Sequence, residues 1–147
     1  MTDRQVSVLL VEDNPGDVRL IRESFRSLQI APALHVASDG VDAIEYLRST
    51  NSESKSRPDL IILDLSLPRK SGLEVLTEIK VTPGIRQIPV LILSSSAADT
   101  DVQKSYDLHA NSYIVKPADL SQVLNVIKAV SEFWMSTVRL PSMNASS

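Results

Sequence analysis

The sequence predicts a single doubly wound α/β domain built around a five-stranded parallel sheet. Short, continuously apolar runs alternate with segments in which apolar residues recur every three or four positions. Continuous apolar runs suit strands that are buried on both faces, and parallel strands need helical crossovers between them. These crossovers are right-handed and place helices on both faces, so the expected strand order is 2-1-3-4-5.

Each apolar run marks one predicted strand. Runs this short could also belong to a buried helix, but their length and flanking turn residues favour strands. Four runs are clear, and the run at 34–37 is a weaker candidate. The predicted strands are Val6–Val11, Leu34–Ala37, Leu60–Leu63, Val90–Leu93 and Tyr113–Val115.

The helical segments follow the strands one by one. Asn14 followed by Pro15 is a good helix start, because a capping side chain precedes a proline at the first helical position. The segment Ser49–Arg57 is polar and serine-rich and predicts a loop. The five apolar stripes are Val18, Ile21, Phe25 and Leu28; Val41, Ile44 and Leu47; Leu73, Leu76 and Ile79; Val102 and Tyr106; and Leu120, Val123, Leu124, Ile127, Val130 and Trp134.

Composition limits the domain organisation and the function. The 147 residues include no Cys and only two His, and the net charge is −3. This excludes a disulfide scaffold, a thiol nucleophile and Cys-ligated zinc, and it argues against binding to DNA. No apolar run approaches the ~18–20 residues that span a bilayer, and the acidic N-terminal segment is unlike a signal peptide. We expect a cytoplasmic domain over residues 1–136, with a partly disordered C-terminal tail over 137–147.

Polar residues follow four of the predicted strands at their carboxyl ends, where ligands bind in open α/β sheets. Glu12 and Asp13 follow the first strand, and Asp64 follows the third. The hydroxyl cluster Ser94–Ser96 follows the fourth strand, and Lys116 follows the fifth. Three acids, hydroxyl groups and an amine are therefore expected at one edge of the sheet.

These residue types suit phosphoryl chemistry. Carboxylates a few ångströms apart repel one another unless a cation lies among them, and oxygen ligands without Cys or His favour Mg²⁺ or Ca²⁺ over zinc. An aspartate can act as a nucleophile and form an acyl phosphate. A lysine and a serine hydroxyl could then contact the phosphoryl oxygens.

Each of these residues also has an ordinary structural interpretation. Glu12 and Asp13 could cap a helix, Asp64 could lie in a loop, Ser94 in a turn, and Lys116 on the surface. Their joint occurrence at the ends of four neighbouring strands favours a functional site.

The chain resembles the receiver domain of bacterial two-component response regulators, which has a CheY-like fold. The resemblance extends from Val6 to Trp134. It rests on LLVEDN at 9–14, LIILDLSLPRKSG at 60–72, IPVLILSSS at 88–96 and YIVKP at 113–117.

The resemblance implies a phosphoacceptor and a metal site. Asp64 matches the aspartate that accepts a phosphoryl group from a sensor histidine kinase. Glu12 and Asp13 match the acids that hold Mg²⁺ together with that aspartate and the backbone carbonyl of the residue here numbered Ser66. Mn²⁺ or Ca²⁺ could take the place of Mg²⁺.

The resemblance also implies phosphoryl contacts and a switch. Lys116 matches the lysine that binds the phosphoryl group, and the backbone amides of Ser66 and Ser95 match further contacts. Ser94 and Tyr113 match a hydroxyl–aromatic pair that changes conformation on phosphorylation. The family has threonine or serine at this position, and Ser94 keeps the hydroxyl group without the methyl group of threonine.

A narrower resemblance concerns receivers that act without an output domain as partners of phytochrome kinases. The segments VEDNPGDVRLIRESF, DLSLPRKSGLEVL, DLHANSYIVKP and FWMSTVRLP are similar to those regulators. They imply a homodimer that signals to a downstream protein, with Trp134 and Tyr106 as candidates for the partner surface. Trp134 could equally be a core residue. The alternative function is a shuttle that passes phosphate to a histidine phosphotransfer protein.

Three other functions fit the residues less well. A dehalogenase-type phosphatase needs a second aspartate two residues after its nucleophile, and that position is Ser66. A flavin carrier needs a Ser/Thr- and Gly-rich phosphate loop after the first strand, where this chain has Glu12 and Asp13. A receiver that only binds partners has no support, because the acids and Lys116 are all present. We expect a phosphoacceptor with self-catalysed phosphotransfer and dephosphorylation, and not an enzyme.

Overall fold

The computed structural model describes residues 6–27, 32–52 and 57–116. The fifth predicted helix, Trp134 and the predicted tail at 137–147 lie outside the described residues. Among the helices in these ranges, none combines the length and the apolar character needed to cross a membrane.

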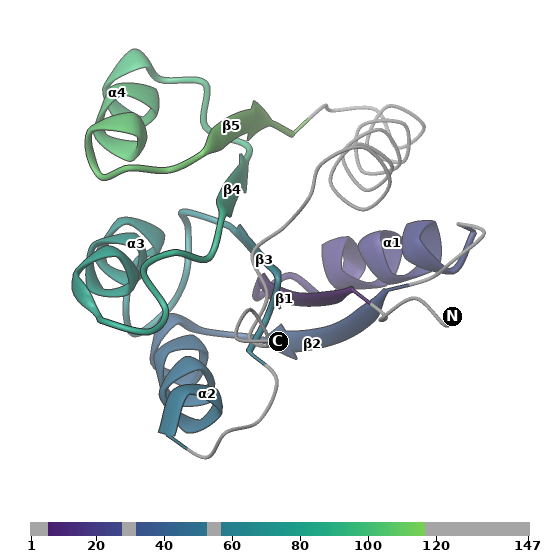
Figure 1. The fold of residues 1–147 in the computed structure, drawn as a ribbon. Coiled ribbons are helices and arrows are strands. Elements are labelled where there is room, and N and C mark those ends of the chain that lie inside the picture. Colours follow the sequence, from purple (N-terminus) through teal and green to yellow (C-terminus); the bar gives the residue numbers. More distant parts are fainter. Residues whose placement is uncertain (1–5, 28–31, 53–56, 117–147) are drawn as a thin grey trace.

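Five parallel strands form one sheet in the order β2-β1-β3-β4-β5, which confirms the predicted topology (Figure 1). Their carboxyl ends are in register, since Val11 pairs with Ala37 and Leu63, and Leu63 pairs with Ile92. This register brings the residues that follow β1 and β3 side by side. The strands are β1 (Ser7–Val11), β2 (Ala33–Ala37), β3 (Leu60–Leu63), β4 (Val90–Ser94) and β5 (Ser112–Val115).

Four helices are described between the strands. They are α1 (Pro15–Arg26), α2 (Gly40–Ser52), α3 (Gly72–Val81) and α4 (Asp99–Asp107). The predicted cap of the first helix is confirmed, because the Asn14 side chain accepts a hydrogen bond from the Asp17 amide at 3.0 Å. A reciprocal capping box between Ser71 and Glu74 begins α3.

Alternate strand residues face two apolar layers (Figure 1). On one face, Leu9, Ile61 and Val90 pack with buried residues of α2 and α3. On the other face, Leu10 and Ile62 pack with α1. Both faces of the central strands are buried, which explains why their sequences are continuously apolar.

One sequence expectation was wrong in detail. The predicted loop at 49–57 overlaps α2, which continues to Ser52. The hydroxyls of Ser49 and Thr50 donate to the carbonyls of Tyr46 and Leu47, so these polar residues are satisfied within the helix. The helix predicted from Val102 and Tyr106 is present as α4, where Val102 is half-buried and Tyr106 is 47% exposed.

Candidate functional site

Three carboxylates gather at the carboxyl ends of β1 and β3. Glu12, Asp13 and Asp64 each offer a ligand oxygen, and these oxygens lie within 4.8 Å of one another. Glu12 is 2% exposed and Asp64 is 7% exposed, whereas Asp13 is exposed. The structure therefore brings together the three acids that the sequence predicted, with two of them removed from water.

Backbone hydrogen bonds fix this cluster to the sheet. The amide of Asp64 donates to the carbonyl of Val11, and the amide of Glu12 donates to the carbonyl of Ala37, both at 3.0 Å. The amide of Ser66 donates to Asp64 Oδ1 at 2.9 Å. One oxygen of Asp64 is thus held by its own loop, and the other faces Lys116.

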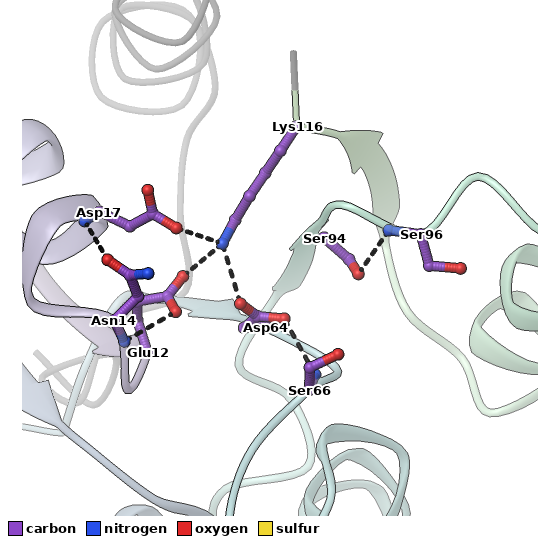
Figure 2. A network of polar contacts seen from close by, with 8 residues as sticks. All are labelled: Glu12, Asn14, Asp17, Asp64, Ser66, Ser94, Ser96 and Lys116. Atoms are coloured by element: carbon purple, nitrogen blue, oxygen red, sulfur yellow. Dashed lines mark hydrogen bonds and ion pairs between the residues drawn. The ribbon is translucent and has the colours of Figure 1, made fainter. Parts of the chain in front are cut away.

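Lys116 extends from the end of β5 into the acid cluster (Figure 2). Its ammonium donates to Glu12 Oε1 at 2.6 Å, to Asp64 Oδ2 at 2.9 Å and to Asp17 Oδ2 at 2.9 Å. The lysine side chain is only 13% exposed. The ammonium compensates part of the negative charge that the buried acids concentrate at this edge.

Burial and charge have opposite effects on the two buried partners. Burial raises the pKa of Glu12 to about 7, although the hydrogen bond from Lys116 works against this rise. Burial alone would lower the pKa of Lys116, but the hydrogen bonds to Glu12, Asp17 and Asp64 outweigh it and place that pKa above its ordinary value. Lys116 is therefore a fixed positive charge at neutral pH.

Asp17 is a member of this network that the sequence reasoning missed. It lies in the first turn of α1, three residues after the Asn14 cap. An acid at that position normally stabilises a helix N-terminus, so the presence of Asp17 there did not indicate a functional residue. Its distance of four residues from Asp13, which is about one helical turn, could have indicated a place near the acid cluster.

The hydroxyl cluster lies on the β4 side of the site (Figure 2). Ser94 is fully buried, and its hydroxyl accepts a hydrogen bond from the Ser96 amide at 3.2 Å. The Tyr113 hydroxyl donates to the Ser96 carbonyl at 2.8 Å, and the ring packs against the core. The Tyr106 hydroxyl accepts from the Tyr113 amide at 3.2 Å. Ser95 and Ser66 are exposed.

Close backbone packing fixes the loop that follows Asp64. A Cβ atom at Gly72 would overlap the carbonyl oxygen of Asp64 and the Cα atom of Leu65. The Gly72 amide also donates to the Leu65 carbonyl at 3.0 Å. Glycine is required here because the start of α3 lies directly against the backbone of Asp64 and Leu65.

The donor set of the acid cluster fits a hard divalent cation. All three side chains offer carboxylate oxygens, and no nitrogen or sulfur ligand belongs to the group found among the described residues. Mg²⁺, Mn²⁺ and Ca²⁺ prefer such oxygen ligands. Asp13 is exposed at the outer side of the cluster, which leaves room for water on a bound ion.

A doubly wound sheet with three acids and a lysine at its carboxyl edge is the arrangement that the sequence resemblance predicted for a signalling receiver domain. Comparison with protein families agrees, because the model of the response regulator receiver domain matches residues 8–128. The chain belongs to this family, and the predicted resemblance is confirmed.

The chain is similar to regulators that are linked to phytochromes. It is 40% identical over 136 residues to Response regulator Rcp1 of Synechocystis sp., covering 92% of each chain. The crystal structure of the phosphorylated cyanobacterial phytochrome response regulator RcpA matches with a TM-score of 0.89 and 46% identity, over 95% of this chain and 100% of that one. The Mn²⁺-bound form of Rcp1 matches with a TM-score of 0.87 and 40% identity, over 92% and 99%. This similarity favours the response-regulator function over the shuttle alternative.

Proposed function

We propose that Asp64 accepts a phosphoryl group from the phosphohistidine of a sensor kinase, and that the phosphorylated domain signals by protein contact. One observation carries this proposal most directly. Asp64, which is 7% exposed, belongs to the acid cluster, and its carboxylate accepts a hydrogen bond from the Lys116 ammonium. A carboxylate in this position is held in place and is flanked by groups suited to bind phosphoryl oxygens.

The chemistry is a single displacement at phosphorus. An Asp64 oxygen forms the new P–O bond while the P–N bond to the kinase imidazole breaks, and the imidazole leaves with a proton from solvent. A divalent cation bound by Glu12, Asp13, Asp64 and the Ser66 carbonyl would neutralise charge on the phosphoryl oxygens. The Lys116 ammonium, 2.9 Å from Asp64 Oδ2, would contact the same group. The backbone amides of Ser66 and Ser95 are further proposed contacts.

The signal would travel through the β4 and β5 side of the site. In this proposal Ser94 reorients its hydroxyl toward the phosphoryl group and breaks its contact with the Ser96 amide. Tyr113 is bonded to the Ser96 carbonyl, so its ring follows that movement. Hydrolysis of the acyl phosphate, in which water attacks phosphorus and Asp64 leaves, resets the domain without a second enzyme.

The partners follow from the relatives. Because similar solved structures include the phytochrome response regulator RcpA and the bacteriophytochrome response regulator AtBRR, we propose a phytochrome-type histidine kinase as the phosphoryl donor. A receiver domain over residues 1–136, working in the cytoplasm as a homodimer, would contact a downstream protein. Tyr106, which is 47% exposed on α4, supports a partner surface there. The role proposed for Trp134 concerns a residue outside the described ranges.

Intact-mass measurement with acetyl phosphate and Mg²⁺ tests the acceptor. Wild type is expected to gain one phosphoryl group, and neither Asp64→Asn nor a chelated sample should gain it. Asp42→Asn is the matched control, because Asp42 is an exposed acid in the first turn of α2, away from the site. A gain that persists in Asp64→Asn would refute the assignment. A folded wild type that gains nothing from acetyl phosphate or from a phosphorylated phytochrome kinase would refute the function.

A further inference from the structure

Asp17 differs from the other two acids that contact Lys116. The ammonium contacts Glu12 at 2.6 Å, and Asp64 and Asp17 at 2.9 Å each. Glu12 and Asp64 also belong to the group of acids that could hold a metal ion, together with Asp13. Asp17 is outside that group, so of the three acids that contact Lys116 it is the one that a bound cation would not use.

The double role of Glu12 and Asp64 creates a competition. The ammonium and a divalent cation both need oxygens of these two carboxylates, and the two positive charges repel each other. Binding of a cation therefore weakens the hold of Glu12 and Asp64 on Lys116. The ammonium of a lysine side chain that is 13% exposed cannot readily exchange these partners for water.

We infer that Asp17 is a positioning residue that keeps the Lys116 ammonium at the site when Glu12 and Asp64 bind a divalent cation. This inference rests on the proposed function and deepens it, because it names the residue that lets the metal and the lysine act at one acceptor. Asp17 would act through Lys116 and without touching the phosphoryl group.

The position of Asp17 suits this role. Its amide is fixed by the Asn14 cap at 3.0 Å, so the first turn of α1 holds the residue firmly in place. Its side chain is 33% exposed, so water also solvates the carboxylate, unlike the deeply buried Glu12. Asp17 also belongs to α1 and not to a strand end, so a cation bound between β1 and β3 leaves it free for the lysine.

Isothermal titration of the full chain with Mg²⁺, and separately with Mn²⁺, tests the inference through a double-mutant cycle. The proteins are wild type, Asp17→Asn, Lys116→Ala and the double variant. Asp17→Asn is expected to weaken cation binding about fivefold, the order expected for coupled charges in contact. Lys116→Ala is expected to tighten it, because the competing ammonium is gone. In the Lys116→Ala background, Asp17→Asn should then change the affinity by less than about twofold.

Two further variants separate positioning from general charge effects. Asp42→Asn removes an equivalent first-turn acid from α2 and should leave cation affinity unchanged. Asp17→Glu keeps the carboxylate and should recover most of the wild-type affinity. Thermal melting of each variant shows that it is folded before titration.

Three results would overturn the inference. The Asp17→Asn variant could bind the cation as tightly as wild type. Asp17→Asn could reduce the cation affinity by the same factor in the presence and in the absence of Lys116. Wild type could also bind no cation at all. Phosphoryl loading of wild type judges the proposed function separately. If wild type is phosphorylated but Asp17 and Lys116 show no coupling in cation affinity, only the role of Asp17 is refuted. If the coupling is present but wild type is not phosphorylated, only the proposed function is refuted.

Discussion

Burial of the Glu12 carboxylate has an electrostatic cost in free energy. It raises the pKa of this carboxylate to about 7 in spite of the contact with Lys116. Asp64 beside it is also buried, so mutual repulsion adds to the cost of desolvation. Lys116 offsets part of this cost through three contacts, and a divalent cation would offset more.

Asp13→Asn tests this charge balance. Asp13 contributes charge to the cluster but is exposed and is not among the three acids that contact Lys116. Without metal, the substitution removes repulsion and should raise the free energy of unfolding by about 0.5 kcal/mol. With Mg²⁺, it should weaken binding, because a ligand is lost. Urea unfolding in chelator and titration calorimetry measure the two effects, and a less stable metal-free variant would contradict the argument.

The sequence was sufficient to predict that the acids and Lys116 lie at one edge of the sheet, because the end of each strand is visible as the end of an apolar run. Glu12, Asp64 and Lys116 each follow such a run directly. Asp17 was not predicted because it lies on a helix, where an acid near the N-terminus has a local explanation. The direction of the Lys116 side chain across the sheet is a tertiary property that no local pattern contains.

The contact between β2 and α2 includes a stacked pair of rings. His35 and Tyr46 lie with ring centroids 3.7 Å apart and planes 9° from parallel. His35 is an exposed residue, but partial desolvation lowers its pKa below the ordinary value. The folded chain therefore prefers the neutral imidazole, and protonation favours the unfolded chain.

This preference predicts a pH dependence of stability. As the pH falls through about 6.5, the unfolded chain binds a proton at His35 before the folded chain does, so the contribution of His35 to the free energy of unfolding decreases. Glu12, whose pKa is raised to about 7, contributes with the opposite sign. The loss from His35 is complete once the pH is below the lowered pKa of the folded state. His35→Phe keeps a stacking ring and should lose this part of the slope. Urea unfolding between pH 5 and pH 8 compares the two, and identical slopes would show that His35 does not contribute.

The end of α2 shows why element boundaries were harder to predict than elements. Ser49 and Thr50 have the composition of a loop, yet their hydroxyls donate to carbonyls one turn earlier. Thr50 is 1% exposed, so tertiary burial extends the helix where local preference would end it. The capping signals were more reliable, because Asn14 makes the predicted bond within its own turn.

For the whole molecule, the sheet order was predictable because few connections are compatible with alternating strands and helices. The two buried faces of β1, β3 and β4 appear in the sequence as continuous apolar runs. Packing between distant segments had no such signature. Gly72 is an example, since only the folded chain places it against the Asp64 backbone.

Gly72→Ala tests how far this packing supports the site. A methyl group there must displace the Asp64 carbonyl or the start of α3, so we expect a loss of roughly 2 kcal/mol of stability. Because the acceptor loop moves, cation affinity should fall as well. Gly16→Ala is the control, since its Cβ would meet only Asn14 Oδ1 at 3.1 Å. Denaturant unfolding and calorimetry measure both, and equal behaviour of the two variants would contradict the role of Gly72.

The contacts of Lys116 also set the order in which a newly made chain becomes competent to signal. The lysine follows Glu12 by 104 residues, Asp17 by 99 and Asp64 by 52. Contacts this distant in sequence form late in folding, after the loops between them have closed. During synthesis the acids therefore emerge long before their lysine. A chain still on the ribosome therefore exposes these acids before the ammonium that offsets part of their charge is available.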